Sequence, residues 1–148
     1  MPVESNFLLL LKATTFALLC IVSLTDIRNR TVPNWALLIL AIVVFTAVPF
    51  SVYHATISLI ILLLGIVAFH YRWLGAGDSK LLAICAYGSI EHWQWLLLQT
   101  ALVGGGLSVA ILVYNHLVGL GLIKHSPIKT VPYAVAIAGS AITTIHYI

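Results

Sequence analysis

Charged residues are scarce in this chain. Only 7% of its 148 residues are Asp, Glu, Lys or Arg, and 61% are hydrophobic, whereas soluble domains carry roughly 25% charged residues. So few charges cannot cover the surface of a water-soluble fold of this length. The composition excludes an ordinary soluble domain and predicts that residues 1–148 form a single membrane-embedded domain.

Disulfide, metal and signal-peptide patterns are missing as well. Cys20 and Cys85 lie in apolar runs without CxxC spacing, which argues against a disulfide framework or a zinc site. The six histidines show no HExxH-like spacing, so we expect neither a metal nor a cofactor. The first apolar run has Glu4 where a signal peptide has a basic start, and no small-residue cleavage site precedes Asp26. We therefore expect this run to be a retained helix.

Long apolar segments make up most of the sequence, and a membrane-crossing helix needs about 20 such residues. Six candidates cover residues 7–25, 35–53, 55–71, 79–90, 94–116 and 131–147. The fourth is short for a complete crossing. The sequence thus predicts an all-α polytopic protein with six transmembrane helices.

Basic residues are absent from every second loop. They occur after the first, third and fifth segments, whereas residues 49–54 and 91–93 contain no Lys or Arg. The basic residues of the three loops are Arg28, Arg30, Arg72, Lys80, Lys124 and Lys129. The positive-inside rule places these loops in the cytoplasm and both termini outside, with Lys12 snorkelling along the first helix. Topology explains the net charge of +3, so we expect membrane lipids and no nucleic acid as partners.

Two of the four acidic residues, Asp26 and Asp78, fall at the predicted cytoplasmic face. Two neighbouring carboxylates can hydrolyse a peptide around one water, because like charges leave one acid protonated and the other ionised. Counting back about 20 residues from the turn at Glu91 puts Asp78 roughly 10 Å below the membrane surface. An ionisable group at that depth is a candidate for function.

Each acid also has a purely structural interpretation. Asp26, beside Arg28 and Arg30, fits a solvated helix cap or a partner for arginine. Asp78 fits a helix start where its carboxylate caps free N–H groups, which is compatible with a catalytic role.

Residues 75–78 read Gly-Ala-Gly-Asp, and two glycines favour irregular backbone. We expect Gly75 and Gly77 to present bare backbone with which an extended substrate pairs by strand addition.

Three segments resemble motifs of the type IV prepilin peptidases, which are membrane aspartyl proteases of the GxGD class. They are residues 26–34 (DIRNRTVPN), 75–81 (GAGDSKL) and 131–134 (VPYA). The resemblance implies that Asp26 and Asp78 are the catalytic acids. It also implies removal of a short basic leader from pilin precursors at the cytoplasmic face of the bacterial inner membrane. The other motif residues that we expect to bind substrate or support the site are Arg28, Gly75, Gly77, Lys80, Pro132 and Tyr133.

The sequence departs from full-length members of that family, which carry a cytoplasmic segment with two CxxC pairs and also N-methylate the new terminus. This chain has neither the segment nor the cysteines. It resembles the short, peptidase-only members of tight-adherence (Flp) pilus systems, so we expect no N-methyltransferase activity.

Several neighbouring residues have more than one interpretation. Arg28 fits a leader-binding residue or a positive-inside anchor, and Lys80 fits a residue that tunes Asp78 or one that snorkels to the headgroups. Asn34 is predicted to cap the second helix. The run Gly104 to Gly106 gives the fifth helix a thin face, which predicts close helix packing.

Two other functional classes stay open at this point. Intramembrane acids also serve as proton or cation sites, so a small proton- or cation-coupled transporter is an alternative. Against it, both acids lie on one face and no inverted repeat is visible. A non-catalytic subunit of a pilus or secretion assembly is the third class, and it predicts that both acids are replaceable.

Overall fold

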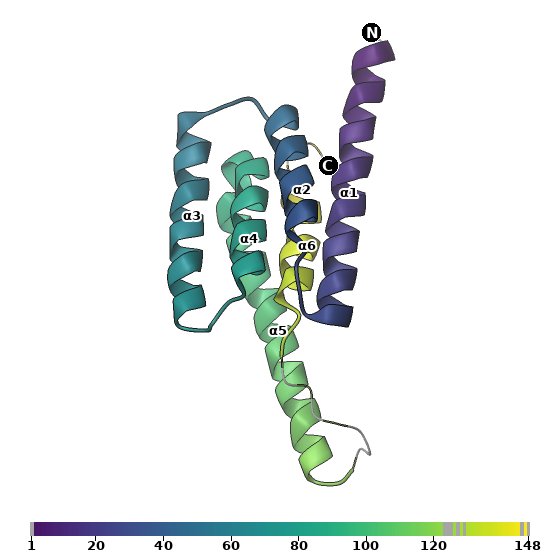
Figure 1. Cartoon of the computed structure of the whole chain (residues 1–148), viewed down its shortest axis with the longest axis vertical. Coiled ribbons are helices and arrows are strands. Elements are labelled where there is room, and N and C mark those ends of the chain that lie inside the picture. Colours follow the sequence, from purple (N-terminus) through teal and green to yellow (C-terminus); the bar gives the residue numbers. More distant parts are fainter. Residues whose placement is uncertain (1, 123–125, 127, 129, 146, 148) are drawn as a thin grey trace.

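The computed structural model describes residues 2–122, 126, 128, 130–145 and 147. Across these residues the chain forms six α-helices and one short 3-10 helix, and no β-strand (Figure 1). The helices are α1 (Pro2–Asn29), α2 (Asn34–Ala47), α3 (Val52–His70), α4 (Ala76–Gly88), η1 (Ile90–His92), α5 (Trp93–Gly119) and α6 (Tyr133–Thr144). The predicted all-α class is confirmed.

The helices differ in length. Helices α1 and α3 contain apolar segments of 24 and 19 residues, and η1 together with α5 forms one of 30 residues. Each of the three is long enough to cross a membrane. Helices α2, α4 and α6 have only 14, 13 and 12 residues. At about 1.5 Å per residue these three reach about 20 Å, against about 30 Å of hydrocarbon. Three long candidate spans are therefore present, and six complete crossings stay a prediction.

Two helix boundaries differ clearly from the predicted segments, for local reasons. Helix α1 continues through Asp26 to Asn29, so Asp26 belongs to the helix and not to a loop. Helix α2 ends at Ala47 and Val48 is extended, because a proline at position 49 disfavours helical backbone in the residue before it.

Helix α4 is central in the bundle. It packs against α2, α3, α5 and α6, with α3 and α1 at the two sides and α5 projecting beyond the other helices at one end (Figure 1). Side chains from all six helices join one core, of which the largest fully buried members include Tyr87, Leu19, Leu40, Leu81, Leu96 and Ile137.

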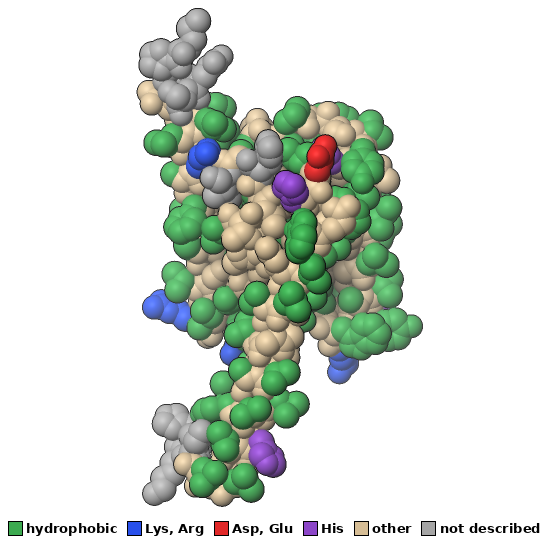
Figure 2. Space-filling model, turned by 180° about the vertical axis from the view of Figure 1, so that it is seen from behind, with side chains coloured by type: hydrophobic (Ala, Val, Ile, Leu, Met, Phe, Trp, Pro, Cys, Tyr) green, Lys and Arg blue, Asp and Glu red, His purple; other side chains and the backbone are tan. Residues whose placement is uncertain are grey.

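Large apolar side chains also cover the outside of the bundle. Phe7, Leu38, Leu64 and Leu102 are more than half exposed, and hydrophobic side chains extend over the face seen in Figure 2. Between the helices, buried hydroxyls pair with one another, as in Thr15 with Tyr147 at 3.0 Å. Apolar outward faces with polar contacts inside are typical of helix bundles in lipid.

The two ends of the bundle carry different charges. Arg28, Arg30, Arg72 and Lys80 are exposed at the end where α1 and α3 finish and α4 begins. Exposed Glu91 lies past the other end of α4. Figure 2 shows most of the visible Lys and Arg side chains at one end and the visible acidic side chain at the other. Lys124, His125 and Lys129, which the predicted third basic loop contains, lie outside the described residues.

Candidate active site

Asp26 lies in the last turn of α1 and is only 6% exposed. Its Oδ2 accepts a hydrogen bond from the backbone N–H of Ala134 at 3.1 Å, across 108 positions of sequence. A carboxylate at the C-terminal end of a helix is unfavourable for that helix's own dipole. The N-terminus of α6 supplies the opposite partial charge, so α1 and α6 meet at this acid.

The motif at residues 131–134 explains why Ala134 is the donor. The first N–H groups of a helix have no partner inside it. Pro132 caps α6 and has no N–H to donate, and the Tyr133 N–H donates to the carbonyl of Val131 at 3.0 Å. Ala134 is the next residue, and its N–H donates to Asp26. The N–H that reaches Asp26 therefore comes from the second residue after Pro132.

Asp78 is the third residue of α4 and caps that helix. Its Oδ2 accepts the N–H of Gly75, the N-cap residue, at 3.3 Å, so the carboxylate does cap the start of α4, from the third helical position. Its Oδ1 is buried and has no hydrogen-bond partner within the described part of the chain. An unpaired buried carboxylate oxygen is costly and is free to engage a water or a substrate group.

At both glycines of the motif, another group lies too close to leave room for a side chain. A Cβ on Gly75 would lie 2.7 Å from Asp78 Oδ2, and a Cβ on Gly77 would lie 2.6 Å from the Cβ of Val32. Gly75 therefore lets the Asp78 carboxylate fold back on its own cap. Gly77 lets the segment after Asp26 pack directly on α4.

Irregular backbone is found at Gly75, which is extended with φ −73° and ψ 148°, but the prediction is wrong for Gly77, which lies inside α4. Ala76 and Gly77 already belong to α4, and neither glycine has positive φ. The Gly75 N–H is bonded to Asp78 and its carbonyl accepts the Ser79 N–H at 3.1 Å. Both backbone groups of Gly75 are occupied, so strand addition has no partner there.

A polar cavity of about 320 Å³ brings the two acids together. It is lined by Asp26, Arg30, Thr31, Val32, Asn34, Gly75, Ala76, Gly77, Asp78 and Lys80. The carboxylates are close enough for the charge of Asp26 to act on Asp78. Two acids that are 52 positions apart in sequence thus line one cavity with room for a water molecule and a peptide group, as two-carboxylate hydrolysis requires.

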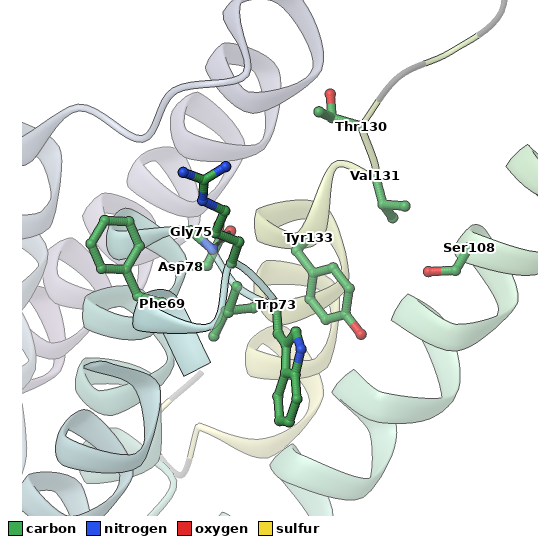
Figure 3. Close-up of a pocket in the computed structure, with 10 residues that line it drawn as sticks. Phe69, Trp73, Gly75, Asp78, Ser108, Thr130, Val131 and Tyr133 are labelled. Atoms are coloured by element: carbon green, nitrogen blue, oxygen red, sulfur yellow. Dashed lines mark hydrogen bonds between the residues drawn. The ribbon is translucent and has the colours of Figure 1, made fainter. Parts of the chain in front are cut away.

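A second, larger cavity of about 660 Å³ adjoins Asp78 on another side. Its lining consists of Phe69, Arg72, Trp73, Leu74, Gly75, Asp78, Ser108, Thr130, Val131 and Tyr133. Figure 3 shows Trp73, from the loop after α3, and Tyr133, from the start of α6, on the same side of the cavity. Among the residues that the structure describes, only Gly75 and Asp78 line both cavities, so they form the boundary between an aromatic space and a polar one.

Tyr133 owes its position to a glycine of α5. A Cβ on Gly104 would lie 2.8 Å from the Tyr133 Cζ, whereas nothing lies within 4 Å of a Cβ on Gly105 or Gly106. The close packing predicted for the glycine run is therefore present at Gly104 alone, where it seats the tyrosine ring.

The polar residues around the acids differ in their contacts. Lys80 donates from Nζ to Asn34 Oδ1 at 3.2 Å. Asn34 is the first residue of α2 rather than its N-cap, which is Pro33 with no side-chain cap bond, so the predicted Asn34 cap is wrong. Arg28 is exposed and is not among the described residues that line either cavity, whereas Arg30 lines the polar one.

Nothing in the sequence separates Arg30 from Arg28. Helix α1 ends at Asn29, and Arg30, the next residue, has a φ of 54°, so its place in the polar cavity depends on the turn that leaves the helix. Arg72 and Trp73, which line the larger cavity, had no signal either, because their placement depends on the turn that ends α3.

The chain was compared with models of known protein families, with curated proteins and with solved structures. The model of the type IV leader peptidase family matches residues 13–146, a range that contains both acids and all three motifs. No curated protein and no solved structure gave a match. The resemblance drawn from the motifs is confirmed, and the chain belongs to the type IV leader peptidase family, as a leader peptidase-like protease held in a membrane.

Proposed function

We propose that this chain is an aspartyl endopeptidase that removes leader peptides from Flp-like type IV prepilins, with Asp26 and Asp78 as its catalytic acids. The observation that carries the proposal is the shared polar cavity, which is lined by both acids, Asp26 from α1 and Asp78 from α4. We treat residues 1–148 as one membrane-embedded peptidase domain without N-methyltransferase activity.

The proposed reaction uses one proton shared by the two acids. The ionised carboxylate removes a proton from a water molecule as the water oxygen attacks the carbonyl carbon of the scissile peptide. The protonated carboxyl gives its proton to the leaving nitrogen as the C–N bond breaks. Because the two acids titrate as a pair, both roles belong to the pair. Each role is lost when either acid is replaced by a residue that cannot ionise, such as asparagine.

The two cavities suggest how a precursor binds. The polar cavity contains both acids with Arg30 and Lys80, so it suits the water and the polarised peptide group. The larger cavity, with Phe69, Trp73 and Tyr133, suits apolar side chains of the precursor next to the cleaved bond. The peptide would cross at Gly75, which has no side chain to obstruct it.

The distribution of charge supports a cytoplasmic orientation of the site. The exposed Arg28, Arg30, Arg72 and Lys80 lie at the end of the bundle that holds the two acids, and the positive-inside rule assigns that end to the cytoplasm. A prepilin held in the inner membrane by its apolar segment would present its leader junction at the same surface.

The decisive experiment is cleavage of an Flp-like precursor by the purified protein in detergent. We expect Asp26→Asn and Asp78→Asn each to lower kcat/KM by about 10³-fold or more, with the double variant no worse, because groups that act as a unit are non-additive. Glu91→Gln is the matched control, since this carboxylate is exposed at the opposite end, and it should cleave normally.

The outcomes separate the competing functions. A folded wild-type protein that cleaves no precursor, but whose acids are needed for proton-coupled uptake into vesicles, would indicate a transporter. Dispensable acids in a pilus assembly assay would indicate a non-catalytic subunit. Near-normal cleavage by one asparagine variant would remove that residue from the mechanism.

Topology is tested separately with reporter fusions. Fusions at Asn29, Lys80 and Lys124 should report the cytoplasm, and those at Ser51 and His92 should report the other side. The inverted pattern would separate the acids from a cytoplasmic leader and contradict the proposed substrate geometry.

A further inference from the structure

Ser79, the residue after Asp78, lies where α3 and α4 come closest. It is 2% exposed. A Cβ on Gly65 of α3 would lie 2.6 Å from the Cβ and 3.2 Å from the Cα of Ser79. Any side chain at position 65 would collide with Ser79, so the backbone of α3 packs directly on the Ser79 side chain. The first turn of α4 therefore cannot shift without disturbing α3.

The Ser79 hydroxyl ties both sides of this contact. Its Oγ lies 3.0 Å from the Gly65 carbonyl oxygen and 3.1 Å from the Gly75 carbonyl oxygen. A serine hydroxyl has one proton to donate, so the two carbonyls share it. The hydroxyl therefore connects the middle of α3 with the cap residue of α4.

Gly75 passes this restraint on to the acid. Its carbonyl is held by the Ser79 hydroxyl and N–H, and its own N–H donates to Asp78 Oδ2. The chain of contacts runs from α3 through Ser79 and Gly75 to the Asp78 carboxylate. Ser79 does not appear among the described residues lining the two cavities next to Asp78. It borders a separate apolar cavity of about 170 Å³, but its hydroxyl is engaged by the two carbonyls, so it is placed to act on the acid.

We propose that Ser79 is a positioning residue for peptide hydrolysis: its hydroxyl fixes the first turn of α4 against α3 and, through Gly75, aims the Asp78 carboxylate at Asp26. This inference rests on the proposed function of Asp78. It assigns a role to a residue that neither the acid pair nor its cavities include.

Ser58 of α3 offers a matched control. Its Oγ donates to the Ala83 carbonyl at 2.7 Å, which is the same type of bond in the same helix pair. Ala83 is five residues beyond Asp78, about 7.5 Å further along the helix. Loss of this bond weakens the packing of α3 on α4 without releasing Gly75.

The experiment measures kcat, KM and thermal midpoint for Ser79→Ala and Ser58→Ala, with one Flp-like precursor as substrate. We expect Ser79→Ala to lower kcat by about 10- to 100-fold with KM within about twofold, because small misplacements of a reacting group have effects of that size. Ser58→Ala should keep kcat within about twofold of the wild type, while its thermal midpoint falls by about as much as that of Ser79→Ala. Ser79→Cys retains a weak donor and should recover part of the kcat.

Unchanged kcat in Ser79→Ala, or equal losses of kcat in both alanine variants, would overturn the inference in favour of simple packing. So would a Ser79→Cys variant with kcat no higher than that of Ser79→Ala. If Ser79→Ala does not fold, Ser79→Cys alone decides: reduced kcat at an unchanged thermal midpoint supports the role, and wild-type kcat overturns it. Asp78→Asn in the same assay tests the function itself. If Asp78→Asn is inactive but Ser79→Ala is fully active, only the positioning role fails.

Discussion

Asp26 lies at the C-terminal end of its helix, whereas Asp78 lies at the N-terminal end of its own. The hydrogen bond to Asp78 comes from three residues away in sequence, and the one to Asp26 comes from 108 residues away. The surroundings of Asp78 are therefore set mainly by local helix capping, and those of Asp26 by the assembly of the whole bundle. The difference teaches that the same chemical group can be positioned locally or globally within a single site.

The largest effect that tests this comparison is expected at Gly77, where the segment that follows Asp26 contacts the helix that carries Asp78. Gly77→Ala puts a Cβ 2.6 Å from the Cβ of Val32, which forces the segment after Asp26 away from α4. We expect kcat/KM to fall by about 10²-fold. Adding Val32→Gly to Gly77→Ala should restore most of the activity, because it removes the Val32 Cβ at 2.6 Å together with its two methyl groups.

Gly75→Ala is the contrasting variant, since its Cβ would meet Asp78 Oδ2 itself at 2.7 Å. The Val32→Gly change should not rescue it. Gly106→Ala, with open space around its Cβ, serves as the neutral control. Rescue of both glycine variants by Val32→Gly, or of neither, would break the distinction between local and global positioning.

A smaller effect is expected where α5 supports the start of α6. Gly104→Ala displaces the Tyr133 ring, whose Cζ lies 2.8 Å from the new Cβ, and Tyr133 precedes the residue that donates to Asp26. We expect a loss of about tenfold in kcat/KM. Gly105→Ala should be neutral, because nothing lies within 4 Å of its Cβ. Equal kinetics of the two variants would show that α6 tolerates a shift of Tyr133.

The smallest effect separates the two arginines after Asp26. Arg30 lines the polar cavity and interacts electrostatically with Asp26, whereas Arg28 is exposed outside it. Arg30→Ala should lower kcat/KM by about threefold, and the loss should shrink at high salt because exposed charges are screened. Arg28→Ala should change it less. A larger loss with Arg28→Ala would indicate that Arg28 contacts the leader directly.

The sequence predicted the acids at one end of the bundle because hydropathy and charge both repeat along the chain in a simple order. The loops with Arg28, Arg30, Arg72 and Lys80 could be assigned to one side without any knowledge of packing. Capping by Asp78 was also predictable, since it depends on residues next to it in sequence.

Features that depend on contacts between distant segments were not predictable. The Gly77 contact with Val32 and the Ala134 bond to Asp26 join parts of the chain that nothing in a single sequence relates. The glycine motif was interpreted as free backbone because glycine permits irregular conformations, yet here its role is to remove side chains from a packed helix start. Asn34 is a residue type that often caps helices, but its side-chain oxygen accepts a hydrogen bond from Lys80 instead.

The bond from Ala134 to Asp26 also has a consequence for the order in which the protein is made. Asp26 is synthesised early, but its donor belongs to the last helix, so a ribosome must finish nearly the whole chain before this acid can be anchored. The capped Asp78 alone can form while synthesis is under way. Completion of the proposed catalytic pair is thereby tied to insertion of α6, and a truncated or partly inserted chain lacks an anchored Asp26.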